Sequence, residues 1–247
     1  MGDWRHRTRL LIGNAGLDAL AAAHVAVFGL GGVGGAAVEV LSRAGVGRLT
    51  LVDLDEISES NLNRQILATR DVLGHAKVDV AAARIQSINP EAIVDLRRDF
   101  FTAKTAQEYL GAMQRPDAVI DAIDGLNSKV FLIHACDALG IPVVTVLGTA
   151  RRMDPTQVRL TTLDDTLGDP LASRVRRRLR RLGFRDRLHK IPAVISTEPP
   201  VETSYGPTEE PSTPEFGRQR PPLPSFPTVP LAAGLVAAYH VLRSLCS

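Results

Sequence analysis

The chain has 247 residues, of which 45% are hydrophobic and 4% aromatic, a composition that suits a folded α/β protein. Its net charge is only +2, so an argument about charged partners must rest on where the charges lie. Cys136 and Cys246 are far apart and form neither a zinc-binding pair nor a disulfide framework, and the polar N-terminus lacks the apolar core of a secretory signal. We therefore expect a cytoplasmic protein.

The first part of the chain alternates between two kinds of hydrophobic pattern. Apolar residues at helical spacing predict a helix over 9–22, and the apolar run 24–29 predicts a buried strand that ends in glycine. The same patterns predict later strands at 49–53, 118–121 and 143–147, and helices at 36–44, 72–88 and 128–139. Alternating strands and helices predict a Rossmann-like, mostly parallel sheet with helices on both faces.

After Gly148 the pattern changes, and a mixed-strand C-terminal extension is expected. Its predicted elements are an exposed or antiparallel strand at 157–163, a very basic helix at 171–182, a strand at 193–197, a proline-rich loop at 199–230 and a C-terminal helix at 231–246. The loop holds ten of the 16 prolines and should cover or border a site. The apolar run 229–245 is interrupted by Pro230, Gly234, His240 and Arg243, so we expect a core helix and no membrane contact.

These segments are interpreted as a single domain over 1–247. Residues 24–148 form its nucleotide-binding core, and residues 149–198 form a basic region on the substrate side. No internal repeat divides the chain.

A glycine-rich turn lies between the first strand and the next helix. Its glycines are Gly29, Gly31, Gly32 and Gly34. A turn of this kind allows close backbone approach and places an anion at a helix N-terminus, which predicts a phosphate-binding site. Asp53, at the end of the next strand, is placed to accept hydrogen bonds from a ribose hydroxyl. These two features alone fit both a dinucleotide and ATP.

Charged and amide side chains downstream favour ATP. Asp55, Asn61, Asn63, Arg64 and Gln65 crowd the segment after the second strand, and Lys77 follows near the start of a helix. Attack of a carboxylate on an α-phosphate brings two anions together, so the reaction needs fixed cations, which Arg64 and Lys77 can supply, and usually Mg²⁺. Asp121 and Asp124 end a later strand and could hold the metal, with Asp124 the preferred ligand.

Together these motifs resemble the ubiquitin-activating-like (ThiF, MoeB, HesA) adenylating superfamily. The matching strings are Gly29-Leu-Gly-Gly-Val-Gly34, Asp53-Leu-Asp55, Asn61-Leu-Asn-Arg-Gln65, Lys77 and Asp121-Ala-Ile-Asp124. The resemblance implies that Asp53 binds ribose, that Asn61, Arg64 and Lys77 contact phosphates, and that Asp124 carries Mg²⁺. It also implies a homodimer in which Arg7 reaches the ATP of the partner subunit.

Within the superfamily, short strings near Asp154, Asp169 and Ser196 are similar to the tRNA threonylcarbamoyladenosine dehydratase branch. That resemblance implies ATP-dependent adenylation of the modified nucleoside's carboxylate, followed by cyclisation to cyclic t6A with release of AMP and pyrophosphate. The chain lacks the zinc-binding cysteine pairs and the loop cysteine of relatives that activate proteins, so no ubiquitin-like protein is expected as substrate. A sulfur-transfer protein is a further candidate partner.

Residues 174–190 form a strongly basic segment. They contain nine cations and a single acid, Asp186. In a chain that is otherwise near neutral, such a cluster predicts contact with a polyanion, and tRNA is the candidate partner. A solvated arginine-rich helix is the alternative explanation.

Two other functions stay open on the sequence alone. The first is an adenylyltransferase for the C-terminal glycine of a ubiquitin-like sulfur-carrier protein, which shares the same ATP motifs. The second is a non-catalytic or dinucleotide-dependent Rossmann protein, which shares only the glycine-rich turn and the acidic residue after it.

Overall fold

The structure is a computed structural model that describes residues 3–99, 106–166, 168–202 and 223–246. Its strands are β1 His24–Phe28, β2 Arg48–Val52, β3 Ile93–Arg97, β4 Ala118–Asp121, β5 Val143–Val146, β6 Val158–Thr162 and β7 Pro192–Ser196. Its α-helices are α1 His6–Ala22, α2 Gly32–Ala44, α3 Lys77–Ile88, α4 Ala106–Gly111, α5 Leu126–Ala138, α6 Pro170–Arg181 and α7 Thr228–Leu245.

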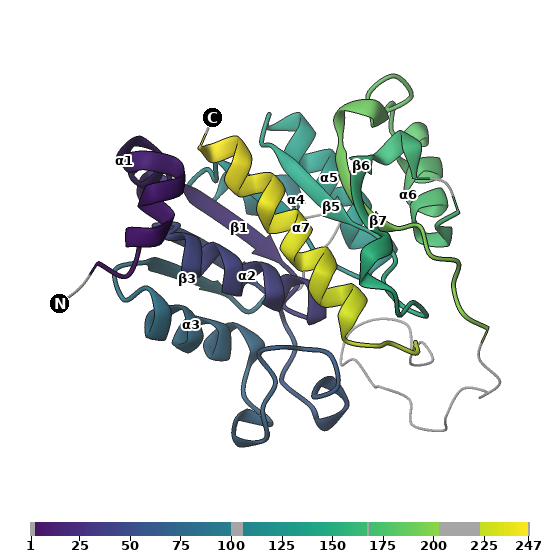
Figure 1. The fold of residues 1–247 in the computed structure, drawn as a ribbon. Coiled ribbons are helices and arrows are strands. Elements are labelled where there is room, and N and C mark those ends of the chain that lie inside the picture. Colours follow the sequence, from purple (N-terminus) through teal and green to yellow (C-terminus); the bar gives the residue numbers. More distant parts are fainter. Residues whose placement is uncertain (1–2, 100–105, 167, 203–222, 247) are drawn as a thin grey trace.

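All seven strands belong to one sheet in the order β3-β2-β1-β4-β5-β7-β6 (Figure 1). Neighbouring strands run parallel except β6, which is antiparallel to β7. The predicted mostly parallel sheet with a mixed C-terminal extension is therefore confirmed. β3 and α4 were not predicted, because β3 is a partly exposed edge strand with mixed polarity and α4 is short.

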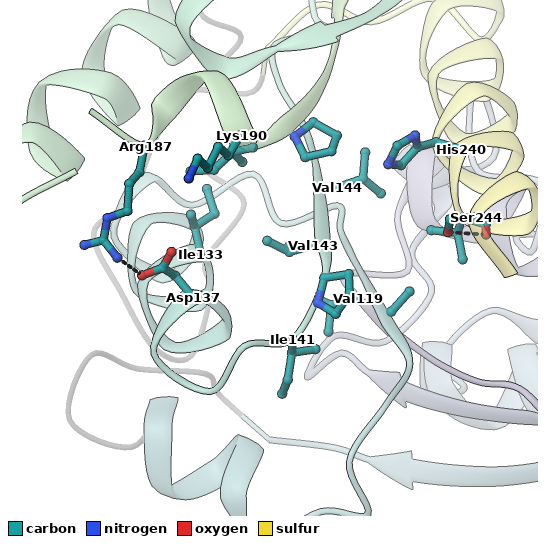
Figure 2. Close-up of a pocket in the computed structure, with 15 residues that line it drawn as sticks. Val119, Ile133, Asp137, Ile141, Val143, Val144, Arg187, Lys190, His240 and Ser244 are labelled. Atoms are coloured by element: carbon teal, nitrogen blue, oxygen red, sulfur yellow. Dashed lines mark hydrogen bonds and ion pairs between the residues drawn. The ribbon is translucent and has the colours of Figure 1, made fainter. Parts of the chain in front are cut away.

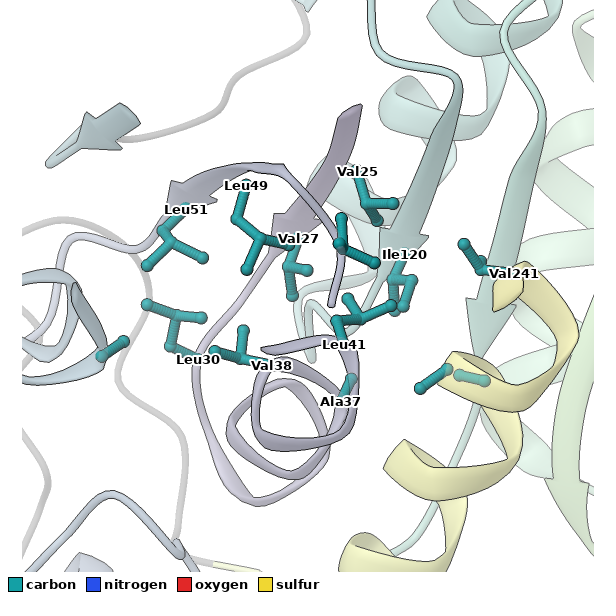
Figure 3. Close-up of a cluster of buried hydrophobic side chains, with 14 of the residues drawn as sticks. Val25, Val27, Leu30, Ala37, Val38, Leu41, Leu49, Leu51, Ile120 and Val241 are labelled. Atoms are coloured by element: carbon teal, nitrogen blue, oxygen red, sulfur yellow. The ribbon is translucent and has the colours of Figure 1, made fainter. Parts of the chain in front are cut away.

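Strand alternation divides the core between the two faces of the sheet. Val25 and Val27 of β1 pack with α2 and α7, whereas Ala26 and Phe28 pack with α4 and α5. Figure 3 shows the first of these clusters, in which Val38 and Leu41 of α2 face the strands. Residues of both faces are fully buried, as expected for a parallel sheet covered by helices on both sides.

The register aligns the carboxyl ends of the central strands. Phe28 of β1 pairs with Val52 of β2 and with Asp121 of β4. The residues that follow these three positions therefore lie side by side at one edge of the sheet, where open α/β folds bind ligands.

Helix α7 packs closely on α2. A Cβ atom built on Gly234 would lie 2.2 Å from the carbonyl oxygen of Val33, so only glycine permits this approach. By length and hydropathy, α7 is the one helix in the described ranges that could cross a membrane. We had expected the proline, glycine and polar residues within it to exclude a membrane span, and by these two criteria they do not. The face that bears Ala233, Ala237 and Val241 is nevertheless buried in the core, which supports its interpretation as a core helix.

Candidate functional site

The turn from Gly29 to Gly34, called the nucleotide turn below, joins β1 to α2 directly. Gly29 has a φ of 89°, and a Cβ atom there would lie 2.7 Å from the carbonyl oxygen of Ala122. A Cβ atom on Gly34 would lie 1.7 Å from the carbonyl oxygen of Gly29. The helix begins at Gly32, four residues earlier than predicted, and no described side chain caps it. The N–H groups of its first turn are therefore available to an anion such as a phosphate.

Asp53 follows β2 and lies beside this turn. Its Oδ2 accepts a 2.6 Å hydrogen bond from the N–H of Leu30, and its Oδ1 accepts one of 2.8 Å from the N–H of Asp55. Burial raises the pKa of the Asp53 carboxyl, and the positive charge of Lys77 acts in the opposite direction. The carboxylate thus orients the turn and keeps a lone pair on each oxygen for a ribose hydroxyl.

Lys77 is the first residue of α3, five residues later than the predicted helix start. Its side chain is 7% exposed, and Nζ lies 2.7 Å from Asp55 Oδ2 and 3.9 Å from Asp53 Oδ1. Asp55 is exposed, whereas Asp53 is nearly buried. Two carboxylates therefore hold the Lys77 ammonium at the carboxyl edge of the sheet.

The segment 61–65 lies over the start of α2. The carbonyl oxygen of Arg64 would be 2.9 Å from a Cβ atom on Gly32, and the buried Gln65 side chain approaches Gly31. The Arg64 guanidinium donates to the carbonyl oxygen of Ser60 and to Asn63 Oδ1, both at 2.8 Å. Partial burial lowers the pKa of Arg64, and the nearby Asp124 carboxylate acts against that shift.

Asn61 stabilises the start of this segment by a hydrogen bond within its own loop. It is buried, and its Oδ1 accepts a 3.2 Å hydrogen bond from the N–H of Ser58. Its position, like that of Gln65, fits a residue that shapes the loop around the nucleotide turn.

The two aspartates at the end of β4 have different surroundings. Asp124 is exposed on the turn before α5, and its negative charge lies close enough to Arg64 to affect that residue's pKa. Asp121 is 0% exposed and lies 2.8 Å from the Nζ of the equally buried Lys129. Burial raises the pKa of Asp121, with Lys129 opposing. The expectation that Asp121 contacts the cofactor directly does not fit this position, because its carboxylate points into the protein.

The donor set fits Mg²⁺ held mainly by phosphates. No group of three or more His, Cys, Asp or Glu residues gathers in the part of the chain that the structure describes. Mg²⁺ is commonly bound by one or two carboxylates together with substrate phosphates and water. Asp124 lies on the turn that follows β4 and is near enough to Arg64 to affect its pKa, a position that matches that mode.

Arg7 does not join these residues within one chain. It is exposed in the first turn of α1, and its neighbour Arg5 contacts Gly45, which ends α2. The nucleotide turn is at the other end of α2, about 20 Å away for a helix of this length. Arg7 therefore does not reach the nucleotide turn of its own chain.

The described C-terminal end of the proline-rich segment, residues 223–230, adjoins the site. Asn63 Nδ2 donates to the carbonyl oxygen of Ser225 at 3.1 Å, and Pro230 lies against Gly32. This agrees with a segment that borders the site, although residues 203–222 lie outside the described ranges. Pro230 and Ser225 carry no sequence motif and were not predicted as site residues.

The basic segment keeps most of its cations at the surface. Ala172, Val175 and Leu179 form the buried face of α6. Arg176 donates to Thr166, Arg180 pairs with Asp164, and Arg187 pairs with Asp137. Arg176 therefore has a hydroxyl and a carbonyl partner but no acidic one, and the other cations without an acidic partner among the described residues are Arg174, Arg177, Arg178, Arg181, Arg185 and Lys190.

A cavity of about 230 Å³ lies at the opposite edge of the sheet (Figure 2). Val143 at the start of β5 and Ile141 contribute to its apolar wall, and Arg187, Lys190 and His240 lie around it. It contains none of the predicted nucleotide-binding residues, so we assign the nucleotide site from the strand ends and not from this cavity.

Comparison with known proteins identifies the family of this chain. The ThiF family model matches residues 5–245. The chain is 36% identical to tRNA threonylcarbamoyladenosine dehydratase of Bacillus subtilis over 97% of this chain and 93% of that protein. It is 44% identical to the enzyme of the same name from Escherichia coli over 72% of this chain and 66% of that protein. The crystal structure of the Escherichia coli dehydratase in complex with ATP matches with a TM-score of 0.84 and 36% identity, over 98% of this chain and 94% of that one. The chain belongs to the ThiF family.

Proposed function

We propose that the chain is an ATP-dependent enzyme that adenylates the carboxylate of threonylcarbamoyladenosine in tRNA and then cyclises it. One observation carries this proposal. The glycine turn, Asp53, Arg64, Lys77 and Asp124 meet at one sheet edge, in a chain that aligns along nearly its whole length with a named dehydratase of that nucleoside.

The first step joins the substrate carboxylate to the nucleotide. A carboxylate oxygen attacks the α-phosphorus, the bond from that phosphorus to the bridging oxygen of the β-phosphate breaks, and pyrophosphate leaves with the electron pair. Negative charge increases on the non-bridging and leaving oxygens as this happens. Preorganised cations are most effective where charge develops in this way.

The chain offers several groups for that task. The N–H groups at the start of α2 and the guanidinium of Arg64 would bind the phosphates, and Lys77 adds an ammonium that Asp53 and Asp55 hold in place. Asp53 would accept hydrogen bonds from the ribose. Asp124 would hold Mg²⁺, which when bound neutralises charge on the phosphate oxygens.

The second step needs no nucleophile from the protein. A nitrogen or oxygen of the same modified side chain attacks the acyl carbon of the adenylate, loses its proton and expels AMP, and proximity favours such ring closure. Cys136 supports this proposal, because it is buried in the core and burial raises the pKa of its thiol. A buried thiol with a raised pKa is a poor nucleophile.

The basic segment supports tRNA as the substrate. Its unpaired cations lie on exposed faces of α6 and the residues that follow, where they can contact phosphates without reading sequence. The reducing environment implied by two free cysteines fits a cytoplasmic enzyme acting on tRNA.

A homodimer completes the proposal. Leu10 and Leu11 of α1 are 74% and 85% exposed, and neighbouring Trp4 is 46% exposed. Exposed apolar groups of this size favour a protein interface, and a second copy that covers α1 would bring Arg7 toward the partner's phosphates.

The decisive test is mass analysis of nucleosides from tRNA after incubation with enzyme and ATP. We expect threonylcarbamoyladenosine to be converted to a product lighter by one water, with pyrophosphate release that requires the modified tRNA and is absent with an unmodified transcript. Release with a sulfur-carrier protein alone would overturn the tRNA assignment in favour of protein adenylation.

A further inference from the structure

A buried ion pair lies directly beneath the turn that carries Asp124. Lys129 of α5 and Asp121 at the end of β4 are both 0% exposed, and Nζ is 2.8 Å from Oδ2. Replacing a buried ion pair by apolar residues of similar volume is often neutral or stabilising. Fold stability is therefore a weak explanation for a lysine at this place.

The contacts of the pair use its hydrogen-bonding capacity fully. Besides Asp121, Nζ donates to the carbonyl oxygen of Val146 at 2.8 Å and to Thr145 Oγ1 at 3.2 Å, which accounts for the three protons of an ammonium. The Thr145 hydroxyl in turn donates to Asp121 Oδ2 at 2.7 Å. A network that is satisfied in this way has one arrangement and resists displacement.

The network is connected to the site through the backbone. Asp121 Oδ1 accepts a 3.2 Å hydrogen bond from the N–H of Ile123, in the residues that lead from β4 to α5. The N–H of Ala122 donates to the carbonyl oxygen of Phe28 at 2.8 Å, and Gly29 packs on the Ala122 carbonyl. The turn 122–125 is thus held at two places. The buried network holds it through Asp121, and the nucleotide turn holds it through the contacts of Ala122 with Phe28 and Gly29.

We propose that Asp121, Lys129 and Thr145 are positioning residues that fix the turn 122–125, so that the Asp124 carboxylate is oriented toward the ATP phosphates. This rests on the proposed function, in which Asp124 holds Mg²⁺. None of the three needs to touch ATP. Weakening the network should therefore impair use of the metal far more than it impairs binding of the nucleotide.

The sharpest probe is Thr145→Val, which keeps the side-chain shape but removes the hydrogen bond that Thr145 donates to Asp121 and the one that it accepts from Lys129. Thr50→Val is the matched control, because Thr50 is equally buried in β2 of the same sheet and its hydroxyl contacts His24 Nε2 at 2.8 Å, away from the turn. Thr145→Ser restores the hydroxyl and serves as the rescue. Each variant is prepared as the full chain, and its thermal unfolding is recorded.

Two readouts separate positioning from stability. The first is binding of Mn²⁺ in the presence of ATP, followed by electron paramagnetic resonance without any tRNA, together with ATP affinity measured without metal. The second is the Mg²⁺ dependence of turnover with modified tRNA. We expect Thr145→Val to weaken Mn²⁺ binding and raise the half-saturating Mg²⁺ concentration by about tenfold, with less than about twofold change in metal-free ATP affinity, as fits loss of the two buried hydrogen bonds of the Thr145 hydroxyl.

Thr50→Val should match wild type in both readouts at a similar loss of stability, and Thr145→Ser should regain most of the metal affinity. Equal metal affinity in Thr145→Val and wild type would overturn the proposal, as would an equal loss in Thr50→Val. If Thr145→Val does not fold, the double variant Asp121→Asn with Lys129→Met takes its place, since it removes both charges and leaves neither unpaired. If wild-type protein binds no Mn²⁺ with ATP, the proposed function itself fails, which is a distinguishable result.

Discussion

The cations at the nucleotide turn are held in different ways. Lys77 lies nearly buried between Asp53 and Asp55, whereas the Arg64 guanidinium is half-buried and bonded to its own loop. Both groups are therefore placed before ATP arrives, which is the arrangement that makes electrostatic stabilisation effective.

Removal of either cation should slow adenylation without unfolding the protein. We expect Lys77→Ala and Arg64→Ala each to lose at least about 2 kcal/mol of transition-state stabilisation, a decrease of roughly 30-fold in kcat/KM. Arg70→Ala is the control, because Arg70 is 81% exposed and its ion-pair partner Glu59, at 3.6 Å, is 78% exposed. Near-normal turnover in both site variants would rule out the assigned roles.

Asp124 is expected to act on the reaction more than on nucleotide affinity. A carboxylate that holds Mg²⁺ contributes chiefly to the charge that develops during phosphoryl transfer, so Asp124→Asn should lose most Mg²⁺-dependent turnover and keep most metal-free ATP binding. Isothermal titration and pyrophosphate release measure these two quantities. Small and equal losses in both would indicate that Asp124 only shapes the turn.

Among the elements, the contact between α2 and α7 fixes the start of α2, where the phosphates are expected. Gly234 lets α7 approach Val33, and Pro230 of the same helix lies against Gly32. A change in this contact should therefore displace the first residues of α2, which are part of the nucleotide turn.

Gly234→Ala should destabilise the protein even though alanine favours helices. Its Cβ atom would lie 2.2 Å from the Val33 carbonyl oxygen, so α7 must shift, and we expect a loss of about 2 kcal/mol in the free energy of unfolding. Gly111→Ala in α4 is the control, because outside its chain neighbours and its own helix backbone no atom lies within 4 Å of the added methyl group among the described residues. Urea denaturation measures both, and equal stability of Gly234→Ala and wild type would contradict the close contact.

The exposed cations of α6 allow a sharper test of RNA binding than the whole segment does. Arg177, Arg178 and Arg181 are exposed without an acidic partner among the described residues, whereas Arg176 and Arg180 bond to Thr166 and Asp164. Only the unpaired group should contribute to phosphate contacts.

We expect the triple replacement of Arg177, Arg178 and Arg181 by Glu to raise the KM for tRNA strongly and leave that for ATP nearly unchanged. The slope of log affinity against log salt should fall by about 0.9 for each lost phosphate contact. The charge-matched control replaces exposed Arg43, Arg70 and Arg97 by Glu, all of which lie far upstream of α6 in the sequence and outside the basic region 149–198. If the control weakens tRNA binding as much, net charge and not the α6 surface governs affinity.

At the scale of the whole molecule, the sequence predicted the sheet and the nucleotide turn, because the apolar run 24–29 and its glycines carry a local signal. It favoured Asp124 as the metal ligand but also assigned Asp121 to the cofactor, since which carboxylate points inward depends on the end of β4 and on Lys129. One feature of the sequence could have identified Asp121 as the buried carboxylate. Lys129 precedes the mostly apolar stretch 130–136, and a cation in a buried helix face needs a buried partner.

The place of Arg7 also depends on the whole molecule, and it yields the last prediction. Within one chain Arg7 and the nucleotide turn lie at opposite ends of α2, so an Arg7 that contributes to catalysis must do so in a partner subunit. Arg7→Ala and Lys77→Ala should each be impaired alone. In a mixed dimer of the two, one site receives both lesions and the other receives none.

Equal mixing with free subunit exchange should therefore restore about one quarter of wild-type activity, since half of the dimers are mixed and each of these has one intact site. Exchange is verified separately with differently tagged subunits. Arg9→Ala is the control in the same helix, because Arg9 is paired with Asp3 at 2.6 Å and should retain activity alone. If subunits exchange and activity stays at the level of the separate variants, Arg7 does not act across a subunit interface, because an Arg7 that served its own chain would leave every site of the mixed dimer with one lesion.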